Sequence, residues 1–359
     1  KATDKGILVD GKLDGQLFST GFLQVRPFSN TYNNKLLYYL IKSDLFLSQK
    51  NDFATGSTQE ALTDNGASEI EIPLPPLAEQ HRIVGKLDFV MQKVESNKQR
   101  LDKIPKLLKR FRQSVLLEAY KGNLTRKWRE ENVSKFSSEE SLNAVIKERV
   151  IRKRTESINV NNIILDIPNS WVLTNIDGIS EFVVDCPHST PKWSPSGKLC
   201  LRTSNFLPNK LNLVERKFVS DSVYLDRISR LKPQKGDILY SREGGILGIA
   251  CILDLDEDVC LGQRMMMFRL NKNIDSKYIC YFLNSPIILS HVNSLIGGSA
   301  APHINVGDIK EYPIPFPSFE EQKEIVRKVE QLFDFADTLE TRYTNAKTIL
   351  DKLPQSILG

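Results

Sequence analysis

The chain has 359 residues, of which 40% are hydrophobic and 26% charged, so it is too long for one ordinary domain and too apolar for a disordered chain. Its net charge of +5 supports a nucleic-acid partner only if the positive residues cluster. No stretch approaches the roughly 18 consecutive apolar residues of a membrane span, and the opening KATDKGILVD contains no signal-peptide core, so we expect a cytoplasmic protein without a membrane partner.

The first predicted segment is residues 1–76, which ends in the proline-rich sequence IPLPP (Ile72 to Pro76). These prolines lack the backbone donor that a helix needs, and they favour extended backbone. Glu79 follows them, and an acidic residue suits the first turn of a helix because of the helix dipole. The prolines therefore predict a junction between a folded segment and a helix.

The second predicted segment, residues 77–121, is a long helix. Apolar side chains recur at alternating steps of four and three residues, which favours a narrow coiled-coil seam over the wider apolar face of a helix that lies on a globular core. At 1.5 Å per residue the seam is about 50 Å long. Its members are Ile83, Leu87, Val90, Val94, Asn97, Leu101, Ile104, Leu108, Phe111 and Val115.

Two residues interrupt the regularity of this helix. Asn97 occupies a seam position, where it either fixes the register as a buried polar residue or faces solvent. Pro105 removes a backbone hydrogen bond, so we expect a kink there.

Basic residues cluster in the second half of the same helix, where Asp102 is the only acid between residues 98 and 112. Such a run can neutralise DNA phosphates without choosing a sequence. The alternatives are a solvated helix face and a docking site for an acidic partner subunit. The candidate contacts to the DNA backbone or to a partner are Lys98, Arg100, Lys103, Lys106, Lys109, Arg110 and Arg112.

Residues 122–166 are predicted to be a helical linker. Ser137 and Glu140 have the spacing of a capping box, and apolar residues follow at helical spacing from Leu142 to Val150.

Residues 167–318 form the next predicted domain. Short apolar runs bounded by Gly, Pro, Asn and Asp predict strands, as in GDILYSREGG, and DSKYICYFLNSPIILSHVNSL predicts two late helices that separate before Pro286. The predicted fold class is therefore α+β. The segment contains neither a phosphate-binding loop nor a base-methyltransferase signature, so we expect no catalytic residue in this chain.

All five cysteines lie in this domain. Their number is odd and none has C-x-x-C spacing, which indicates reduced thiols that pack as small hydrophobic residues. Cys186 and His188 outline one corner of a metal site, but no second closely spaced pair completes it. We predict no metal.

The last predicted segment, residues 319–359, is a second long helix with the same seam spacing, and it contains Pro354, where we also expect a kink. IPFPSFEEQKEIV lies 242 positions after IPLPPLAEQHRIV, and the two copies align without a gap from Gly56 to Val115. A repeat of this length is too long for a solenoid unit and indicates a duplicated domain plus helix. If a pseudo-twofold axis relates the copies, the two helices run antiparallel.

The order of these features resembles the specificity subunit of Type I restriction–modification systems. The matching motifs are the two proline-to-EQ junctions, the helices ending QSVL and QSIL, and a domain that begins IPNSWVLTNI and carries CPHSTPKW, KGDILYSREG and GGSAAPHIN. The resemblance covers essentially the whole chain. It implies mixed α/β target-recognition domains joined by two long antiparallel coiled-coil helices that set the distance between them. Residues 1–76 then correspond to the later half of the first domain, either in a fragment or in a naturally shortened protein.

The resemblance also implies a function. It is that of a non-catalytic subunit that recognises a bipartite site in double-stranded DNA and docks two methyltransferase subunits and the restriction (motor–nuclease) subunits. S-adenosylmethionine, ATP and Mg belong to those partners, and no cofactor is expected in this chain. The alternative is a truncated remnant that acts only as a protein-interaction scaffold.

Sequence choice requires side chains that present hydrogen-bonding groups to base edges, such as Arg to guanine and Asn or Gln to adenine. The polar loops of the matching motifs supply such groups, although each residue has an ordinary turn as its alternative. The candidates are His188, Ser189, Thr190, Lys192, Trp193, Arg202, Ser204, Asn205, Arg242, Gln263 and Arg264, with Thr58 and Gln59 in the first domain.

Overall fold

The structure is a computed structural model that describes residues 6–9, 16–17, 22–28, 31–54, 61–132, 134–148, 166–296 and 302–358. The chain divides into two compact units. Unit 1 contains Lys1–Leu107 and Thr338–Gly359, and unit 2 contains Leu108–Asp337. Each unit therefore includes a part of both long helices. The sequence patterns instead predict each long helix as a segment of its own.

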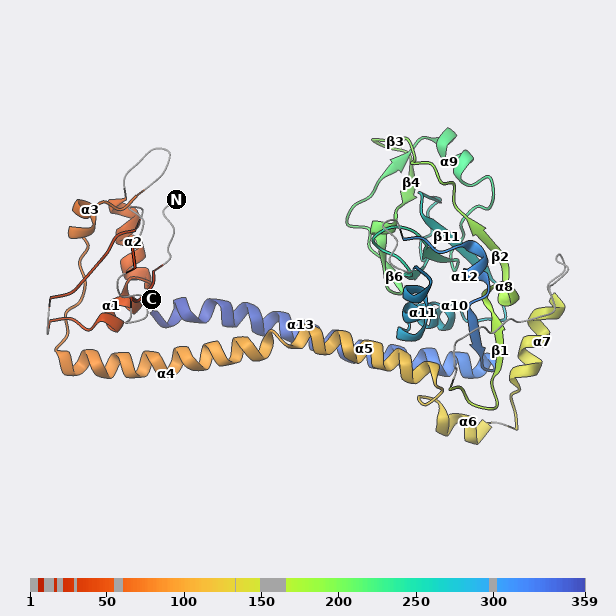
Figure 1. The fold of residues 1–359 in the computed structure, drawn as a ribbon, viewed down its shortest axis with the longest axis horizontal. Helices are drawn as coiled ribbons and strands as arrows, with labels where there is room; N and C mark the ends of the chain where they lie inside the picture. The colour runs from red at the N-terminus through yellow and green to blue at the C-terminus, as the bar shows by residue number, and fades with distance from the viewer. Residues whose placement is uncertain are drawn as a thin grey trace. The chain divides into compact units, whose positions relative to one another are not determined.

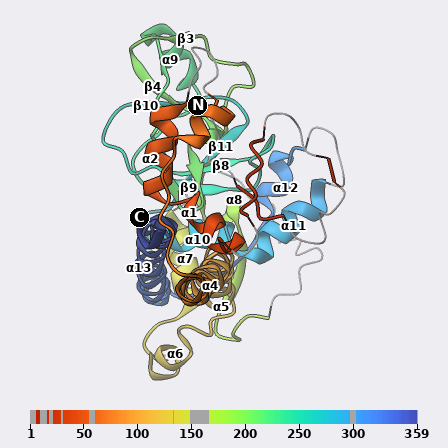
Figure 2. The ribbon, with the colours of Figure 1, turned by 90° about the vertical axis from the view of Figure 1, so that its left-hand side faces the viewer.

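Unit 1 is helical in the residues described. Side chains of Asn33, Ser43 and Thr63 accept hydrogen bonds from backbone N–H groups and so cap its three short helices. A long helix follows, and the last turns of α13 lie beside it (Figures 1 and 2). The elements are α1 (Asn34–Leu40), α2 (Asp44–Phe53), α3 (Asp64–Ser68), α4 (Leu77–Leu101) and the C-terminal part of α13 (Phe319–Leu358).

Unit 2 has mixed α and β structure, as predicted. Its helices are α5 (Ile104–Tyr120, from Leu108), α6 (Arg126–Asn132), α7 (Ser138–Glu148), α8 (Ile176–Ile179), a 3-10 turn (Thr203–Asn205), α9 (Asp221–Arg227), α10 (Ser276–Leu283), α11 (Pro286–Ile296), α12 (Val306–Lys310) and the first part of α13. Its strands are β1 (Val172–Asn175), β2 (Ser180–Asp185), β3 (Trp193–Ser194), β4 (Lys198–Leu201), β5 (Phe206–Leu207), β6 (Lys210–Leu211), β7 (Phe218–Val219), β8 (Ile238–Ser241), β9 (Ala250–Ile252), β10 (Val259–Leu261), β11 (Met265–Leu270) and β12 (Pro313–Phe316).

The strands of unit 2 form two four-stranded sheets and two strand pairs. One sheet has the order β2-β11-β8-β9 and is antiparallel throughout. The other has the order β10-β4-β7-β3, in which β10 and β4 are parallel. β1 pairs with β12, so the second proline-rich motif is a strand that closes onto the start of the domain. β5 pairs with β6.

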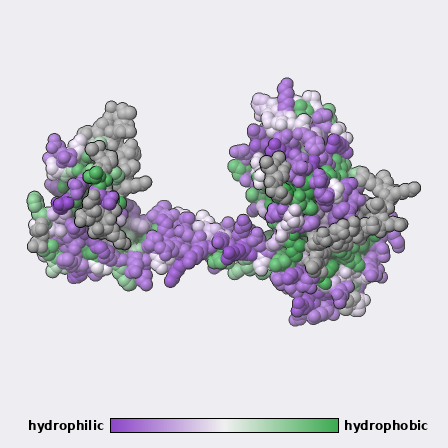
Figure 3. Space-filling model, in the orientation of Figure 1, coloured by the Kyte–Doolittle hydropathy of each residue, from purple (hydrophilic) through white to green (hydrophobic). Residues whose placement is uncertain are grey.

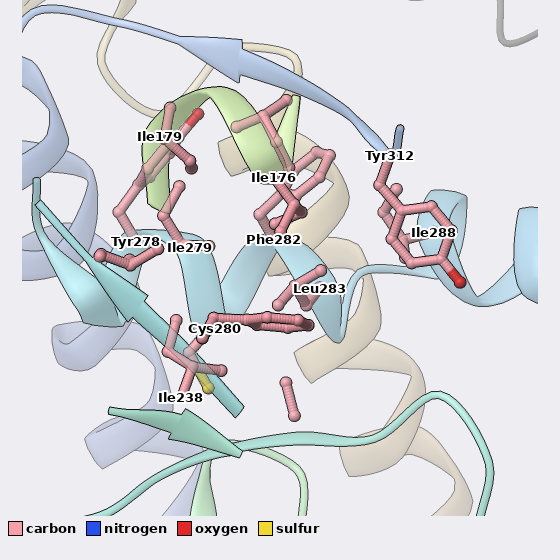
Figure 4. Close-up of a cluster of buried hydrophobic side chains, with 14 of the residues drawn as sticks. Ile176, Ile179, Ile238, Tyr278, Ile279, Cys280, Phe282, Leu283, Ile288 and Tyr312 are labelled. Carbon is pink, nitrogen blue, oxygen red and sulfur yellow. The ribbon is translucent and has the colours of Figure 1, made fainter. Parts of the chain in front are cut away.

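The β2-β11-β8-β9 sheet separates two apolar cores. Side chains alternate across a strand, so Met266 and Phe268 face one core while Met265 and Met267 face the other. Figure 4 shows part of the first core, where Ile238 of β8 lies with residues from α8, α10 and α11. Because both faces of the sheet are covered, β11 begins with four apolar residues in a row, Met265 to Phe268, rather than an alternating pattern.

The duplication is also present in the structure. Four helices of unit 1 begin 242 positions before four later ones: α1 before α10, α2 before α11, α3 before α12, and α4 before α13. Side-chain contacts repeat as well. Lys35 pairs with Asp88 at 2.8 Å, and the equivalent Lys277 pairs with Glu330 at 2.5 Å.

Each junction contains the same pair, a glutamate followed by a glutamine. The glutamine makes equivalent contacts in both copies. Gln80 is fully buried; its Oε1 accepts from the backbone N–H of Asn33 at 2.7 Å, and its Nε2 donates to the carbonyl of Pro75 at 2.8 Å. The equivalent bonds of Gln322, both at 3.1 Å, join Asp275 and Pro317. Each glutamine therefore ties a short helix to the start of a long one.

The glutamates that precede them have different surroundings. Glu321 is buried, and it accepts hydrogen bonds from Thr125 at 2.7 Å, Arg129 at 2.8 Å and Trp171 at 2.8 Å. Glu79, the equivalent residue, is exposed and pairs only with the nearby Arg82 among the described residues.

The long helices pair antiparallel in unit 2, because Phe111 stacks edge-on with Phe335 while Thr125, further along, binds Glu321. Every predicted seam position is buried or half-buried except Asn97. Asn97 is exposed, so a buried polar residue does not fix the register there. The predicted interruption at Pro105 is confirmed, since α4 ends at Leu101 and α5 begins at Ile104, whereas α13 continues through Pro354.

Within the described residues, no single helix has both the length and the apolar character to cross a membrane. The bent pair α10 and α11 passes that test by length and composition only.

Candidate nucleic-acid interface

Three predicted motifs meet at one end of the β2-β11-β8-β9 sheet. β2 ends at Asp185 and β8 ends at Ser241, and the strand between them, β11, begins at Met265, which pairs with Ser241. The loops that follow or precede these strand ends are residues 186–192, 242–249 and 262–264, and we call them the polar end. They contain most of the residues predicted from CPHSTPKW, SRE and GQR.

Arg242 supports the polar end from inside. Its guanidinium donates to the two carboxylate oxygens of Asp185 at 2.9 and 3.1 Å and to the carbonyl of Ile304 at 3.1 Å. Glu243 lies 2.9 Å from the same guanidinium, and the Arg242 side chain is only 8% exposed. Arg242 therefore holds loops in place, which differs from its predicted role as a base contact.

Sequence reasoning missed a second buried arginine, Arg227 of α9. It donates to the carbonyl of Gly262 at 2.8 Å and to the carbonyl and hydroxyl oxygens of Ser189 at 2.5 and 3.1 Å. It thereby links two loops of the polar end. No local pattern marks Arg227, because it lies in a short helix that matches none of the motifs.

Other predicted residues are displayed on the surface. His188 is 62% exposed, with Nε2 3.1 Å from Asp185 and Nδ1 3.7 Å from Glu243. Thr190 donates to Oε1 of Gln263 at 3.1 Å. Ser189, Lys192 and Arg264 are exposed, and the last two have no side-chain hydrogen bond or ion pair among the described residues.

The candidates around β3 and the 3-10 turn divide in the same way. Asn205 is buried; its amide donates to the carbonyls of Asn212 and Glu215 at 2.9 and 3.0 Å, so it stabilises its own turn. Arg202 pairs with Glu215 at 3.2 Å. Two further candidates are exposed: Ser204, and Trp193 with Lys217 5.2 Å from its ring. Asn205 is therefore a structural residue of this turn, which differs from its predicted role as a base contact.

The predicted basic run lies on α4, on α5 and in the turn between them, which contains Lys103. Its members are exposed except Arg112, which is half-buried and pairs with Asp337. The visible surface over the middle of α13 and the facing turns of α5 is mainly hydrophilic (Figure 3). Thr58 and Gln59 lie outside the described residues.

The five cysteines are all buried, as expected for packing residues. Cys186 accepts a hydrogen bond from the Met265 N–H, and burial raises the pKa of its thiol to about 11. Among the residues whose placement is known, no group of His, Cys, Asp and Glu is arranged to hold a metal ion.

Residues 10–106 and 197–347 match the family described as "Type I restriction modification DNA specificity domain". The EcoKI specificity subunit of Escherichia coli K12 is 31% identical, over 93% of this chain and 66% of the relative. The EcoDI specificity subunit of Escherichia coli is 30% identical, over 90% of this chain and 68% of that relative. This chain thus spans about two thirds of the length of these relatives.

The fold matches a chain from a solved structure on complex assembly and conformational transition of the type I R-M system. The TM-score is 0.66 at 22% identity, and the match covers 98% of this chain and 76% of that chain.

Proposed function

Because this chain belongs to the Type I restriction–modification DNA specificity family, we propose that it is a non-catalytic subunit that recognises a DNA sequence. The polar end of unit 2 carries this proposal. Two buried arginines fix its loops while His188, Thr190, Lys192 and Arg264 remain exposed. Fixed loops with exposed donors and acceptors are suited to base edges, because little order has to be gained on binding.

The two long helices support the rest of the proposal. We propose that the helices set the separation of two half-sites in double-stranded DNA. They also provide the surface that binds two methyltransferase subunits, and the restriction subunits complete the complex. S-adenosylmethionine, ATP and Mg²⁺ then act in those partner subunits, in the cytoplasm where the DNA is.

Selection from a random pool of double-stranded DNA tests this function. We expect the full chain, co-expressed with its methyltransferase subunit, to enrich a split sequence at several salt concentrations. Enrichment of no sequence, with the methyltransferase subunit still bound, contradicts DNA recognition and leaves the scaffold alternative.

A further inference from the structure

We propose that Arg264 is the residue by which unit 2 distinguishes guanine in its part of the DNA site. The inference rests on the proposed function and adds to it the identity of one base and the side chain that reads it.

The first argument is availability. Three other arginines beside the polar end have partners inside the protein: Arg227 binds backbone carbonyls, Arg242 binds Asp185, and Arg230 donates to the carbonyl of Asp185 at 3.0 Å. Arg264 is exposed and has no such partner among the described residues. Its guanidinium donors therefore have no partner among the described residues, at the end of the sheet where the loops meet.

The second argument is that the turn carrying Arg264 is fixed. Gly262 donates to the carbonyl of Leu201 at 2.8 Å, and a Cβ at Gly262 would lie only 2.8 Å from that oxygen, so a side chain does not fit. Arg227 donates a hydrogen bond to the Gly262 carbonyl at 2.8 Å. Gln263 is held by Thr190.

The third argument is the backbone of Arg264 itself, whose φ is 69°. A residue with a side chain rarely adopts this left-handed conformation, and it persists where the surroundings enforce it. Here the carbonyl of Arg264 accepts from the Arg242 N–H at 3.1 Å. The conformation aims the side chain over Gly244, where a Cβ would come within 3.4 Å of Nη1, so Gly244 leaves room for the guanidinium.

The chemistry of a guanidinium selects the base. Its planar pair of donors matches O6 and N7 of guanine in the major groove, and that pairing discriminates against the wrong base by about 5- to 150-fold. A phosphate also accepts hydrogen bonds from a guanidinium. Loss of a phosphate contact, however, weakens binding to all sequences alike.

The test compares base preferences, position by position, for the full chain bound to its methyltransferase subunit. Starting from the sequence that the wild type enriches, each base pair is varied and affinities are measured. We expect Arg264→Ala to lose the preference for one G·C pair by about 5- to 150-fold and to keep the other preferences. Arg264→Lys keeps the charge without the planar fork, so we expect it to preserve the salt dependence and to lose most of that one preference.

Lys210→Ala is the matched control, because it removes another exposed cation of unit 2, on β6 rather than in the loops of the polar end. It should leave every base preference unchanged. If Arg264→Ala weakens all sequences equally, or changes no preference, the assignment of Arg264 is wrong. If the wild type itself has no preference, the proposed function is wrong instead. Tryptophan fluorescence during urea unfolding checks that each variant is folded.

Discussion

Glu321 is a buried carboxylate that accepts from Arg129 of α6, from Thr125 before α6 and from Trp171 before β1. Replacing it with alanine leaves Arg129, 15% exposed, without its countercharge. We therefore expect Glu321→Ala to lower the free energy of unfolding of unit 2 by about 3–5 kcal/mol. All three tryptophans lie in unit 2, so their fluorescence during urea unfolding measures this unit.

The repeat supplies the control. Glu79→Ala changes the equivalent position, which lies in unit 1, is exposed and pairs only locally among the described residues. Because unit 1 contains no tryptophan, its stability is followed by hydrogen exchange in α4, and a loss below about 1 kcal/mol is expected. Equal losses at the two positions would show that the buried contacts of Glu321 contribute no more than a surface ion pair.

Asp88 makes the stability of unit 1 depend on pH in the acid range. Hydrogen bonds from Lys35 and Tyr39 lower the pKa of its carboxyl below the ordinary value of 3.8. A folded-state pKa below the unfolded one stabilises the folded state above the unfolded pKa, and this stabilisation disappears as the pH falls through the folded pKa. We expect the protection of α1 against hydrogen exchange to decrease below the ordinary carboxyl pKa in the wild type, and we expect Asp88→Asn to lose this part of the pH dependence.

Asp52→Asn is the matched control for that experiment, because Asp52 is exposed in α2 and has no side-chain hydrogen bond or ion pair among the described residues. The same loss of protection at low pH in the Asp88 and Asp52 variants would assign the acid sensitivity to other groups.

The glutamine junctions determine how each short helix joins a long one. Gln80→Ala removes the acceptor of the Asn33 N–H and one donor to Pro75, and buried groups left unsatisfied cost about 1–3 kcal/mol each. We expect the Asn33 amide and α1 to exchange hydrogen about tenfold faster or more. Gln322→Ala should act in the same way on Asp275 and α10.

Gln92→Ala is the comparison for both junction variants, since Gln92 is an exposed residue of α4 without a side-chain contact in the described part of the chain. Unchanged exchange at Asn33 and Asp275 in the junction variants would mean that packing alone fixes these helices.

The basic run on α4 and α5 affects the molecule as a whole. If its exposed lysines contact phosphates, each replacement should reduce the slope of log K against log salt by about 0.9 and weaken all DNA sequences alike. Lys98→Gln, Lys103→Gln, Lys106→Gln and Lys109→Gln, made together, test this by binding at several salt concentrations. An unchanged slope with loss of the methyltransferase subunit would assign the run to partner docking.

Local rules were sufficient for several elements of this chain. The 242-residue offset, the helix starts after the prolines, the seam spacing, the break at Pro105 and the helices α7, α10 and α11 agree with expectation. Each of these depends on residues close in sequence: a cap, a proline without a donor, or a periodic apolar face. The same motifs predicted the family, because their order, their spacing and their duplication are together specific to it.

The candidate site depended on contacts between distant segments. SRE and GQR each contain an arginine that sequence patterns cannot tell apart, yet Arg242 is buried against Asp185 while Arg264 is exposed. The difference arises where β2, β8 and β11 meet, since only there does a carboxylate lie within hydrogen-bond distance of one guanidinium and not the other. The amino-acid order was enough to establish the duplication, the helices and the family. The folded chain alone decided which side chains are supports and which are displayed, because burial is a property of neighbours far away in sequence.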